Sequence, residues 1–588
     1  VSISRRKAPT TEIERLNDSI KIFNEKTALR VEHAVKFDGY AILSGWTFGD
    51  VKLRTNDSIG RFAVDRPDVV GIMGETAKGF SFVILLDEND PSDLALEILI
   101  GSEAFRTPIR LDTGLRQANS ALIANGDIWP ELFELVGRSL QWRRLFASHE
   151  QDVTAKGLNA ILEAAVAYGD SGVMAVGWAH GNAEYRFWLA SEHAWRSLET
   201  VSRYARQDVY DALKGETNLS SDNLGFFASL TGSFTHGDEI GLVAIGKRKF
   251  SFIAKTNVVR GVPDPKEASA HMFAIPTPIQ EFAKRVASDD MVLLEDLLKA
   301  RASGWPDIMV TERPFGIEPK APEISIIVPL YGRSDLMEHQ LAKFSKDADF
   351  TEGRVELLYV VDDPALSRST LDSGDLLYGL YNVPFKVIWG GVNRGYSGAN
   401  NLGAAHARGR TFVMLNSDVF PSQPGWATRL ASLLEANPDF GVITPRLVFA
   451  DGSLQHVGIN FTYEQKFRIW INNHLLAGLP VTADSTAGLV ERPAVTGACM
   501  VVKAADFRAV GGFDTGYLIG DFEDSDFCMK MRALGKKPGY WPRETLTHLE
   551  RQSFRMIDGN EYRQKVVIYN AQRHFARWEK QIVDLTAA

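Results

Sequence analysis

Two stretches of this 588-residue chain repeat the same landmarks in the same order. A strand-like segment ends in Gly45-Trp46, and a later one ends in Gly177-Trp178. A fixed order with an offset that drifts between roughly 130 and 146 residues is what duplication followed by loop insertions leaves. The further matching landmarks are Arg61-Phe62-Ala63 and Arg203-Tyr204-Ala205, Asp68-Val69 and Asp208-Val209, and Gly79-Phe80 and Gly225-Phe226. The first half is therefore predicted to hold two copies of one module, unless the two Gly-Trp segments resemble each other by chance.

Each copy combines short runs rich in Val, Ile, Phe and Tyr with turns made of Gly, Asp and Asn. This composition is typical of an antiparallel β-sandwich. Amphipathic helical periodicity follows, over 128–146 in the first copy and over 279–298 in the second. We predict two repeated antiparallel β-sandwich modules, each followed by helices, at residues 1–150 and 151–313.

The pattern changes at about Pro322. Apolar strands over 324–330, 355–361 and 411–415 alternate with helical stretches such as 426–434, which favours a parallel or mixed α/β sheet. The Pro-rich residues 314–322 are predicted to be a linker, and 323–588 a separate α/β domain. That domain ends in an amphipathic helix over 561–583, which either packs on the domain or binds a membrane surface or a partner.

Charge and cysteine usage narrow the class of protein. A formal net charge of −9 argues against non-specific binding to nucleic acid. Cys499 and Cys528 cannot form a disulfide framework, and their apolar neighbours predict buried free thiols, as in a reducing compartment. No apolar run approaches the roughly 18 residues that span a bilayer. We therefore expect a cytoplasmic protein, and its oligomeric state stays open.

Polar residues follow the predicted strands of the second half, where an open α/β sheet binds its ligands. Asp362 follows 355–361 and suits a hydrogen bond to a base or ribose, although it could equally cap a turn. The small residues of Asn393–Gly403 open a helix whose first amides favour an anion. Asn416 and Asp418 follow 411–415 and could present oxygen ligands to one hard cation, although a turn is the commoner alternative.

The most acidic stretch lies at residues 520–527 and contains Asp521, Glu523, Asp524 and Asp526. These carboxylates repel one another, so burial of all of them without a cation is disfavoured. The alternative is a solvated helix N-terminus stabilised by the helix dipole. His548 lies further on, and an isolated histidine is more often structural than catalytic.

The order and spacing of these motifs resemble the family 2 inverting glycosyltransferases with the GT-A fold, over Ile324 to about Ser553. Bacterial rhamnosyl- or galactosyltransferase-like members that build polysaccharides are the most similar. The resemblance rests on Pro329 in the first strand, Asp362, Asn393–Gly403, Asn416–Asp418 as a variant of the Asp-X-Asp motif, Thr496–Cys499, Gly512–Asp514, Glu523–Asp526 and His548. It implies a Rossmann-like mixed sheet.

The resemblance also implies roles for individual residues. Asp524 would be the catalytic base, and Asp418 and His548 would bind a divalent cation, Mn²⁺ or Mg²⁺. The donor pocket would contain Pro329, Tyr331, Asp362, Asn393, Gly395, Asn400, Asn416 and Ser417. The acceptor would contact Gly497, Glu523 and Asp526.

The implied reaction moves a sugar, with inversion, from a UDP- or dTDP-sugar to a hydroxyl of a glycan or lipid-linked glycan. This would serve cell-surface polysaccharide synthesis, with peripheral attachment to the inner face of the membrane left open. A charged diphosphate leaving group and a deprotonated acceptor require such a cation and base.

Two departures from the family pattern keep an alternative open. Asn416 stands where the motif has an aspartate, which lowers the charge of the site. Pro364-Ala365-Leu366 follows Asp362-Asp363 in place of the usual Ser and Asp, so the choice of nucleotide is undetermined. The alternative is a carbohydrate-binding or scaffolding protein with a degenerate transferase domain. A nucleotidyltransferase is disfavoured, because residues 330–334 lack a Gly-rich phosphate loop.

Overall fold

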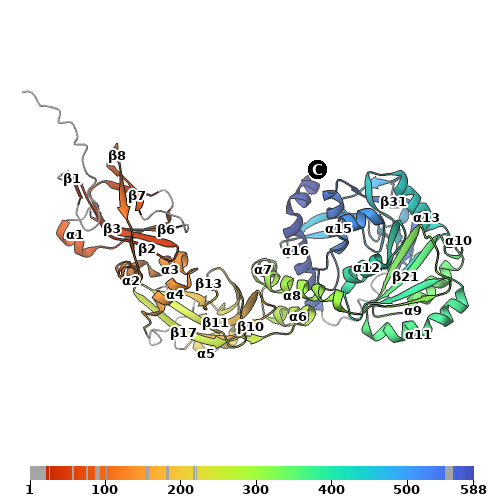
Figure 1. Cartoon of the computed structure of the whole chain (residues 1–588), viewed down its shortest axis with the longest axis horizontal. Coiled ribbons are helices and arrows are strands. Elements are labelled where there is room, and N and C mark those ends of the chain that lie inside the picture. Colours follow the sequence, from red (N-terminus) through yellow and green to blue (C-terminus); the bar gives the residue numbers. More distant parts are fainter. Residues whose placement is uncertain are drawn as a thin grey trace, which may run out of the picture. The chain divides into compact units, whose positions relative to one another are not determined.

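The structure is a computed structural model that describes residues 21–24, 27–55, 58–73, 77–86, 93–100, 102–151, 158–180, 184–215, 219, 221–549 and 560–587. The chain divides into two compact units, Val1–Arg260 and Gly261–Ala588 (Figure 1). Within the described ranges, none of the helices combines the length and the apolar character needed to cross a membrane.

The first repeat is built from two facing sheets. One has the order β1-β2-β3-β6-β5, with β9 on β2, and the other has the order β4-β7-β8. Leu43 and Phe82 of the first sheet pack against Leu96 and Ile98 of the second, so alternate residues of each strand build the core. The elements are β1 (Lys21–Asn24), β2 (Thr27–Phe37), β3 (Tyr40–Phe48), β4 (Val51–Arg54), β5 (Ser58–Val64), α1 (Pro67–Met73), β6 (Lys78–Leu85), β7 (Asp93–Ile100), β8 (Glu103–Arg110) and β9 (Asp112–Thr113).

The main sheet of the second repeat, β14-β15-β11-β10-β18, has the same order as β5-β6-β3-β2-β9 of the first, and both β18 and β9 pair parallel with their neighbours. Trp178 pairs with Gly225 as Trp46 pairs with Gly79, and both central hairpins carry one bulge. A second sheet has the order β13-β12-β16-β17. The elements are β10 (Asn159–Ala167), β11 (Gly172–His180), β12 (Arg186–Ala190), β13 (Trp195–Ser197), β14 (Ser202–Tyr204), α5 (Gln207–Leu213), β15 (Gly225–Thr231), β16 (Glu239–Gly246), β17 (Lys249–Asn257) and β18 (Val259–Arg260).

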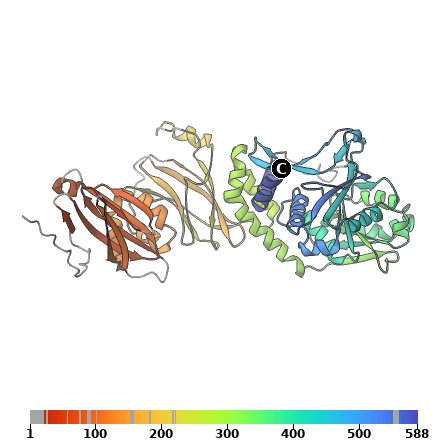
Figure 2. The same ribbon diagram turned by 90° about the horizontal axis from the view of Figure 1, so that it is seen from above.

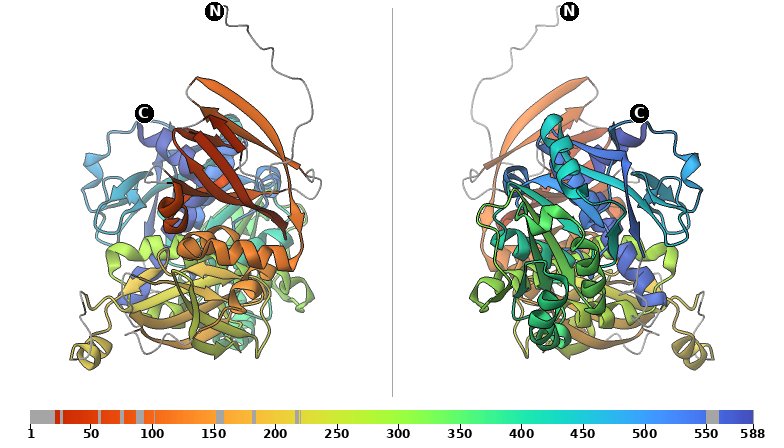
Figure 3. Two further views of the ribbon diagram at one scale, coloured as in Figure 1. Left: turned by 90° about the vertical axis from the view of Figure 1, so that its left-hand side faces the viewer. Right: turned by 90° about the vertical axis from the view of Figure 1, so that its right-hand side faces the viewer.

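Short helices join the two repeats into one unit. They are α2 (Leu115–Ala124), η1 (Gly126–Ile128), α3 (Trp129–Val136) and α4 (Leu140–Ala147), the last capped by Ser139 through its Oγ to Trp142 N, at 3.1 Å. Phe133 and Phe146 pack against strands of both repeats, including Ile42 and Trp188. The orange helices therefore lie between the two sets of strands (Figure 3, left).

The second unit begins with helices that we predicted as the end of the second repeat. These are α6 (Pro265–Ala274), α7 (Ile279–Arg285), the π-helical turn η3 (Val286–Asp290), α8 (Met291–Ser303) and η4 (Trp305–Asp307). They pack on the C-terminal helix α16 (Asn560–Ala587), where Phe273 contacts Tyr562 and Tyr569 (Figure 2). Residues 261–313 thus fold with the C-terminal domain.

The C-terminal domain is a mixed α/β sheet, as predicted. Its strand order is β19-β22-β21-β20-β23-β30-β25-β31-β24. Strands β20–β23 are parallel to one another, whereas β19 and β30 pair antiparallel with β22 and β23. Pro314 and Phe315, which were predicted to lie in the linker, belong to β19. The strands are β19 (Thr311–Phe315), β20 (Ile324–Leu330), β21 (Val355–Val361), β22 (Phe385–Trp389), β23 (Thr411–Leu415), β24 (Val419–Pro421), β25 (Phe440–Val448), β26 (Leu454–His456), β27 (Ile459–Glu464), β28 (Ile469–His474), β29 (Val490–Glu491), β30 (Cys499–Lys503) and β31 (Lys537–His548).

Helices cover both faces of this sheet. Leu357 and Tyr359 point to one core, and Leu358 and Val360 point to the other, as alternation along a strand requires. Cys499 and Cys528 are free and buried, which confirms that prediction. The helices are α9 (Asp335–Phe344), α10 (Ala348–Thr351), α11 (Pro364–Tyr381), α12 (Gly395–His406), α13 (Trp426–Ala436), η5 (Val481–Ala483), α14 (Ala504–Ala509) and α15 (Glu523–Ala533).

Candidate active site

A cavity of about 630 Å³ opens at the carboxyl ends of β20, β21 and β23. This is the edge at which an open α/β sheet binds ligands. Eleven of the predicted site residues line it: Pro329, Tyr331, Asp362, Asn393, Gly395, Asn416, Ser417, Asp418, Glu523, Asp524 and His548. Residues far apart in the sequence therefore meet around one space large enough for a small ligand.

Asp362 follows β21 and is buried at one end of the cavity. Its Oδ1 accepts a hydrogen bond from the backbone N–H of Arg394 at 2.6 Å. Asn393 Nδ2 donates to the backbone carbonyl of Asp362 at 2.6 Å. Burial raises the pKa of Asp362 to about 7, although the Arg394 amide and the charge of Arg301 favour the ionised form. This carboxyl can therefore change its protonation state near neutral pH.

Asp418 and His548 are brought together by strand pairing. Val419 of β24 pairs with His548 of β31, and Leu549 N donates to the carbonyl of Asp418 at 3.0 Å. His548 Nε2 then lies 3.1 Å from Asp418 Oδ1. The other ring nitrogen, Nδ1, lies 2.7 Å from Gln455 Oε1, which orients the imidazole.

The residues beside this pair fit a divalent cation that is shared with a ligand. Asn416 Oδ1 is buried without a hydrogen-bond partner, and it lines the same cavity. With Asp418 and His548 it offers two oxygens and one nitrogen, ligands that Mn²⁺ accepts readily. No group of three His, Cys, Asp or Glu gathers around one point in the described ranges. The set therefore suits an ion that takes its remaining ligands from phosphate oxygens and water.

Asp524 lies in the first turn of α15 and faces the cavity. Its carboxylate accepts hydrogen bonds from Gly497 N at 3.0 Å and Ser525 N at 2.7 Å. Burial raises its pKa, and these hydrogen bonds oppose that shift. Burial and the charges of Asp524 and Asp521 raise the pKa of Glu523 well above its usual value. A carboxyl that is buried but still reaches the cavity is suited to take up a proton.

The loop before Asp524 has an unusual backbone. Ile519, Asp521 and Phe522 have φ angles of 62°, 80° and 76°, which non-glycine residues seldom adopt. Residues 517–521 line the cavity, so the loop forms one of its walls. Such backbone strain persists only where the surroundings hold it.

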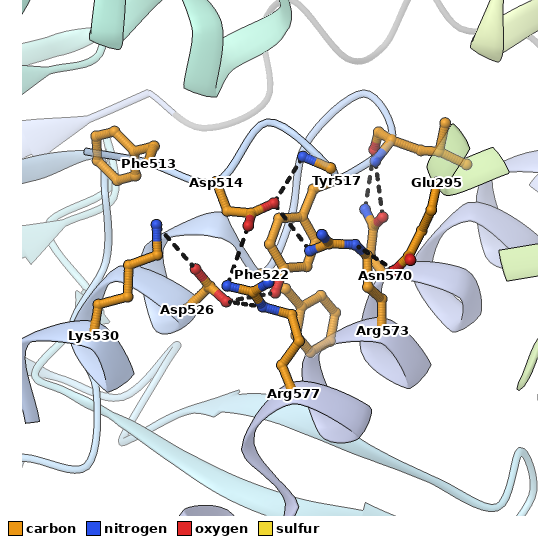
Figure 4. A network of polar contacts seen from close by, with 12 residues as sticks. Glu295, Phe513, Asp514, Tyr517, Phe522, Asp526, Lys530, Asn570, Arg573 and Arg577 are labelled. Atoms are coloured by element: carbon orange, nitrogen blue, oxygen red, sulfur yellow. Dashed lines mark hydrogen bonds and ion pairs between the residues drawn. The ribbon is translucent and has the colours of Figure 1, made fainter. Parts of the chain in front are cut away.

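Helix α16 supplies those surroundings (Figure 4). The side chain of Asn570 makes three hydrogen bonds to the backbone of Leu518 and Gly520, and Arg573 Nη1 lies 3.0 Å from Asp514 Oδ1. Arg573 Nε also lies 3.4 Å from Glu295 of α8. Polar contacts from α16 therefore fix the strained loop against the rest of the domain.

The predicted acceptor residue Asp526 lies away from the cavity. It is fully buried and accepts hydrogen bonds from Arg577 Nε at 2.8 Å, Trp578 Nε1 at 2.7 Å and the Tyr517 hydroxyl at 3.1 Å (Figure 4). It does not line the cavity. Residues two apart on a helix point to opposite sides, so Asp526 faces α16 because Asp524 faces the cavity. This periodicity was available in the sequence.

Asn400 and Gly497 also lie outside the cavity wall. Asn400 is buried in α12, where its Nδ2 donates to Tyr396 O at 3.0 Å. Gly497 donates its N–H to Asp524, and its carbonyl accepts from the Tyr396 hydroxyl at 2.8 Å. Both residues therefore support groups that line the cavity, and neither is placed to contact a ligand by its side chain.

The cavity is also lined by residues that no sequence motif identified. They are Asp264 and Lys266 at the start of α6, Arg301 of α8, His474 of β28 and Arg563 of α16. Nothing in the local pattern marks them, and α6 and α8 were in addition assigned to the second repeat. The cavity brings them together with residues that are distant in the chain.

Comparison with known proteins gives two curated relatives. An uncharacterized protein, y4gI, of Sinorhizobium fredii is 28% identical over 239 residues, which cover 40% of this chain and 25% of that protein. The O-antigen biosynthesis protein RfbC of Myxococcus xanthus is 26% identical over 241 residues, which cover 40% of this chain and 18% of that protein. The match therefore spans a quarter or less of the length of these relatives.

Two solved glycosyltransferase structures are also similar in part. GalNAc-T7 with UDP, GalNAc and Mn²⁺ has a TM-score of 0.34 and 16% identity, covering 44% of this chain and 50% of that chain. The mannosyltransferase PcManGT of Pyrobaculum calidifontis, in complex with GDP-Man and Mn²⁺, has a TM-score of 0.29 and 15% identity, covering 53% and 85%.

The sequence model of Glycosyl transferase family 2 matches residues 325–489. This stretch runs from β20 past β28 and includes Asp362, Asn416, Asp418 and His474, which line the cavity. Residues 325–489 are therefore a glycosyl transferase family 2 domain, carried on the mixed α/β sheet of the second unit.

Proposed function

We propose that this protein is an inverting glycosyltransferase that moves a sugar from a nucleoside diphosphate to a hydroxyl of a glycan or lipid-linked glycan. One observation carries the proposal: Asp362, Asp418, His548 and Asp524 line the same cavity. The family 2 match over 325–489 supports the same conclusion. The relative named for O-antigen biosynthesis supports a role in making a cell-surface polysaccharide.

The donor would lie along the carboxyl edge of the sheet. Asp362 would accept a hydrogen bond from the base, between Pro329 and Asn393, and Tyr331 would cover the ring. The diphosphate would reach Asp418, which follows β23, and His548 at the end of β31, because β23 is next to β20 in the sheet. The sugar would then point toward Asp524 and Glu523 on the far wall.

Asp524 would act as the general base. Its carboxylate is held by the N–H groups of Gly497 and Ser525, so it can keep one orientation while it takes the proton of the acceptor hydroxyl. Burial raises its pKa, which strengthens it as a base. The hydroxyl oxygen would attack the anomeric carbon opposite the diphosphate, and the bond to the leaving oxygen would break, which inverts the configuration.

Asp418, His548 and Asn416 would hold a divalent cation, Mn²⁺ or Mg²⁺, which when bound stabilises the negative charge of the departing diphosphate as a Lewis acid. The protein's own part is to orient these ligands. Gln455 fixes the imidazole of His548, and Gln340 donates to the Asn416 carbonyl at 3.0 Å.

Nucleotide release from a panel of sugar nucleotides tests the proposal. The full chain should slowly hydrolyse at least one of UDP-, dTDP- or GDP-linked sugars when Mn²⁺ or Mg²⁺ is added, and faster with a glycan acceptor. The alternative, a carbohydrate-binding scaffold, is favoured by Asn416 in the metal motif. A purified protein that binds glycans and releases no nucleotide from any donor would establish the scaffold.

A further inference from the structure

Helices outside the family 2 stretch form part of the cavity. The lining includes Asp264, which caps α6, together with Lys266 of α6, Arg301 of α8 and Arg563 of α16. Helices α6 and α8 precede residue 325, where the family match begins, and α16 follows residue 489, where it ends. This wall of the cavity, which we call the added wall, therefore comes from outside the stretch that matches the family 2 model.

The added wall is fixed to α16 by specific contacts. Lys565 Nζ donates to Phe273 O at 2.6 Å, and the hydroxyls of Tyr562 and Ser269 lie 2.8 Å apart. Arg573 Nε lies 3.4 Å from Glu295 Oε1 of α8. Packing of Phe273 on Phe282 and Tyr569 fills the space between these contacts. Arg301 is thus carried on a helix with a defined position.

Arg301 reaches the cavity with unused hydrogen-bonding capacity. Its Nε is buried and has no hydrogen-bond partner. Its guanidinium lies 5.7 Å from the centre of the Trp305 ring, which limits its movement. Burial lowers the pKa of Arg301, and the charges of Asp264 and Asp362 oppose that shift. A buried guanidinium nitrogen without a partner is unfavourable unless a ligand supplies an acceptor.

The Nε of the neighbouring Arg394 is also buried without a hydrogen-bond partner, but other contacts hold the rest of this side chain. Its Nη2 donates to Gly390 O at 2.9 Å, and its guanidinium lies 5.4 Å from the centre of the Trp305 ring. Its backbone N–H holds Asp362. Arg394 therefore braces Trp305 and Asp362, and Trp305 in turn contacts Arg301.

We propose that Arg301 and Asp362 together recognise the base of the donor nucleotide. The pair would select bases that have a ring N–H group next to a carbonyl group. Uracil, thymine and guanine have this edge. The Asp362 carboxylate would accept from the ring N–H, and the Arg301 guanidinium would donate to the adjacent carbonyl oxygen. Cytosine and adenine present an acceptor nitrogen and an amino group there, which would leave both protein groups unpaired. This inference rests on the proposed glycosyltransferase function.

Calorimetric titration of the full chain with UDP, dTDP, GDP, CDP and ADP, with Mn²⁺ present, tests the inference. The protein should bind at least one of the first three about 10- to 100-fold more tightly than CDP and ADP. Arg301→Met should weaken that binding about 10-fold or more and remove the discrimination. Arg301→Lys keeps a hydrogen-bond donor and a positive charge, so this variant should retain part of the discrimination between nucleotides.

Arg313→Met is the matched control, because Arg313 is an exposed arginine of β19 that pairs with Asp375. It should bind like the wild type. Wild-type ratios in Arg301→Met, or a preference of the wild type for ADP or CDP, would overturn the role of Arg301 and leave the proposed function standing. Absence of any nucleotide binding by the wild type would overturn both. If Arg301→Met does not fold, the selectivity of Arg301→Lys decides the question.

Discussion

The side-chain amide of Asn570 hydrogen-bonds to both polar groups of Leu518. Its Oδ1 accepts from Leu518 N at 2.9 Å, and its Nδ2 donates to Leu518 O at 3.0 Å and to Gly520 O at 2.7 Å (Figure 4). The residues between and beyond, Ile519, Asp521 and Phe522, have positive φ angles. One buried amide on α16 therefore holds the strained loop that leads into Asp524.

Asn570→Leu should uncouple this loop from α16. It leaves buried backbone groups of Leu518 and Gly520 without partners, at about 1–3 kcal/mol for each unsatisfied group. We expect the kcat for sugar transfer to fall at least about tenfold, since small displacements of a catalytic group have effects of this size. Nucleotide affinity, measured by calorimetry, should change little, because Asp362 lies on another element. Asn437→Ala, which removes one local bond to Leu433 O, is the control. Full kcat in folded Asn570→Leu would show that the hydrogen bonds of Asn570 to Leu518 and Gly520 are not needed for catalysis.

Asp524→Asn should nearly abolish transfer. The amide keeps the size of the side chain but cannot take the acceptor proton, and general-base catalysis typically contributes about 10²–10⁴-fold. Binding of the nucleotide sugar should stay within a few-fold. Steady-state transfer rates and calorimetry measure the two effects, with Asp451→Asn in an exposed turn as the control. Turnover at the wild-type rate would remove Asp524 from the role of base.

Asp418→Ala and His548→Ala should each raise the Mn²⁺ concentration needed for half-maximal activity. Each removes one of a small number of protein ligands, and loss of even an outer partner of a metal ligand lowers affinity about 10- to 100-fold. Metal titration of activity, after chelator treatment, measures the shift. His406→Ala is the control, because His406 contacts Glu312 on another part of the domain. Activity that persists unchanged in chelator would contradict the metal site.

Nucleotide binding should depend on pH through Asp362. Its pKa is raised to about 7, so the carboxylate that accepts the base N–H is lost as pH falls below that value. Affinity should therefore be constant above about pH 8 and fall about tenfold per unit at low pH. Arg301 and the Arg394 amide favour the charged form, and the neighbouring Tyr331 and Asp363 are the other ionisable groups beside it. Calorimetry from pH 5.5 to 8.5 measures the profile, which Asp362→Asn should flatten. A flat wild-type profile would be inconsistent with this role.

Asp526→Asn should affect stability and leave the acceptor KM unchanged. The carboxylate lies between Arg577, Trp578 and Lys530 without solvent contact. Removing the charge of one partner from a buried ion pair is destabilising by about 3–5 kcal/mol. Chemical denaturation measures this change, and KM is measured on the folded protein. A large rise in the acceptor KM with unchanged stability would instead support contact between Asp526 and the acceptor.

The sequence alone determined the elements of the second half and the chemistry at their ends. Alternation of apolar strands and helices predicted a mixed α/β sheet, and the strand ends identified Asp362 and Asp418, because a buried strand that stops at a carboxylate is a local signal. The Gly-Trp landmarks also led to two stretches with the same strand order and the same Trp–Gly cross-strand pairs.

Only the tertiary structure decided which distant residues share the cavity. Arg301 and Lys266 precede the family 2 stretch in the sequence. They line the cavity because α6–α8 pack on α16 and do not continue the second repeat. Asp526 was placed with Asp524 because the two are close in sequence, yet the helix turns them to opposite sides. The physical reason is that secondary structure follows from contacts within a few residues, whereas packing joins segments whose separation along the chain carries no pattern.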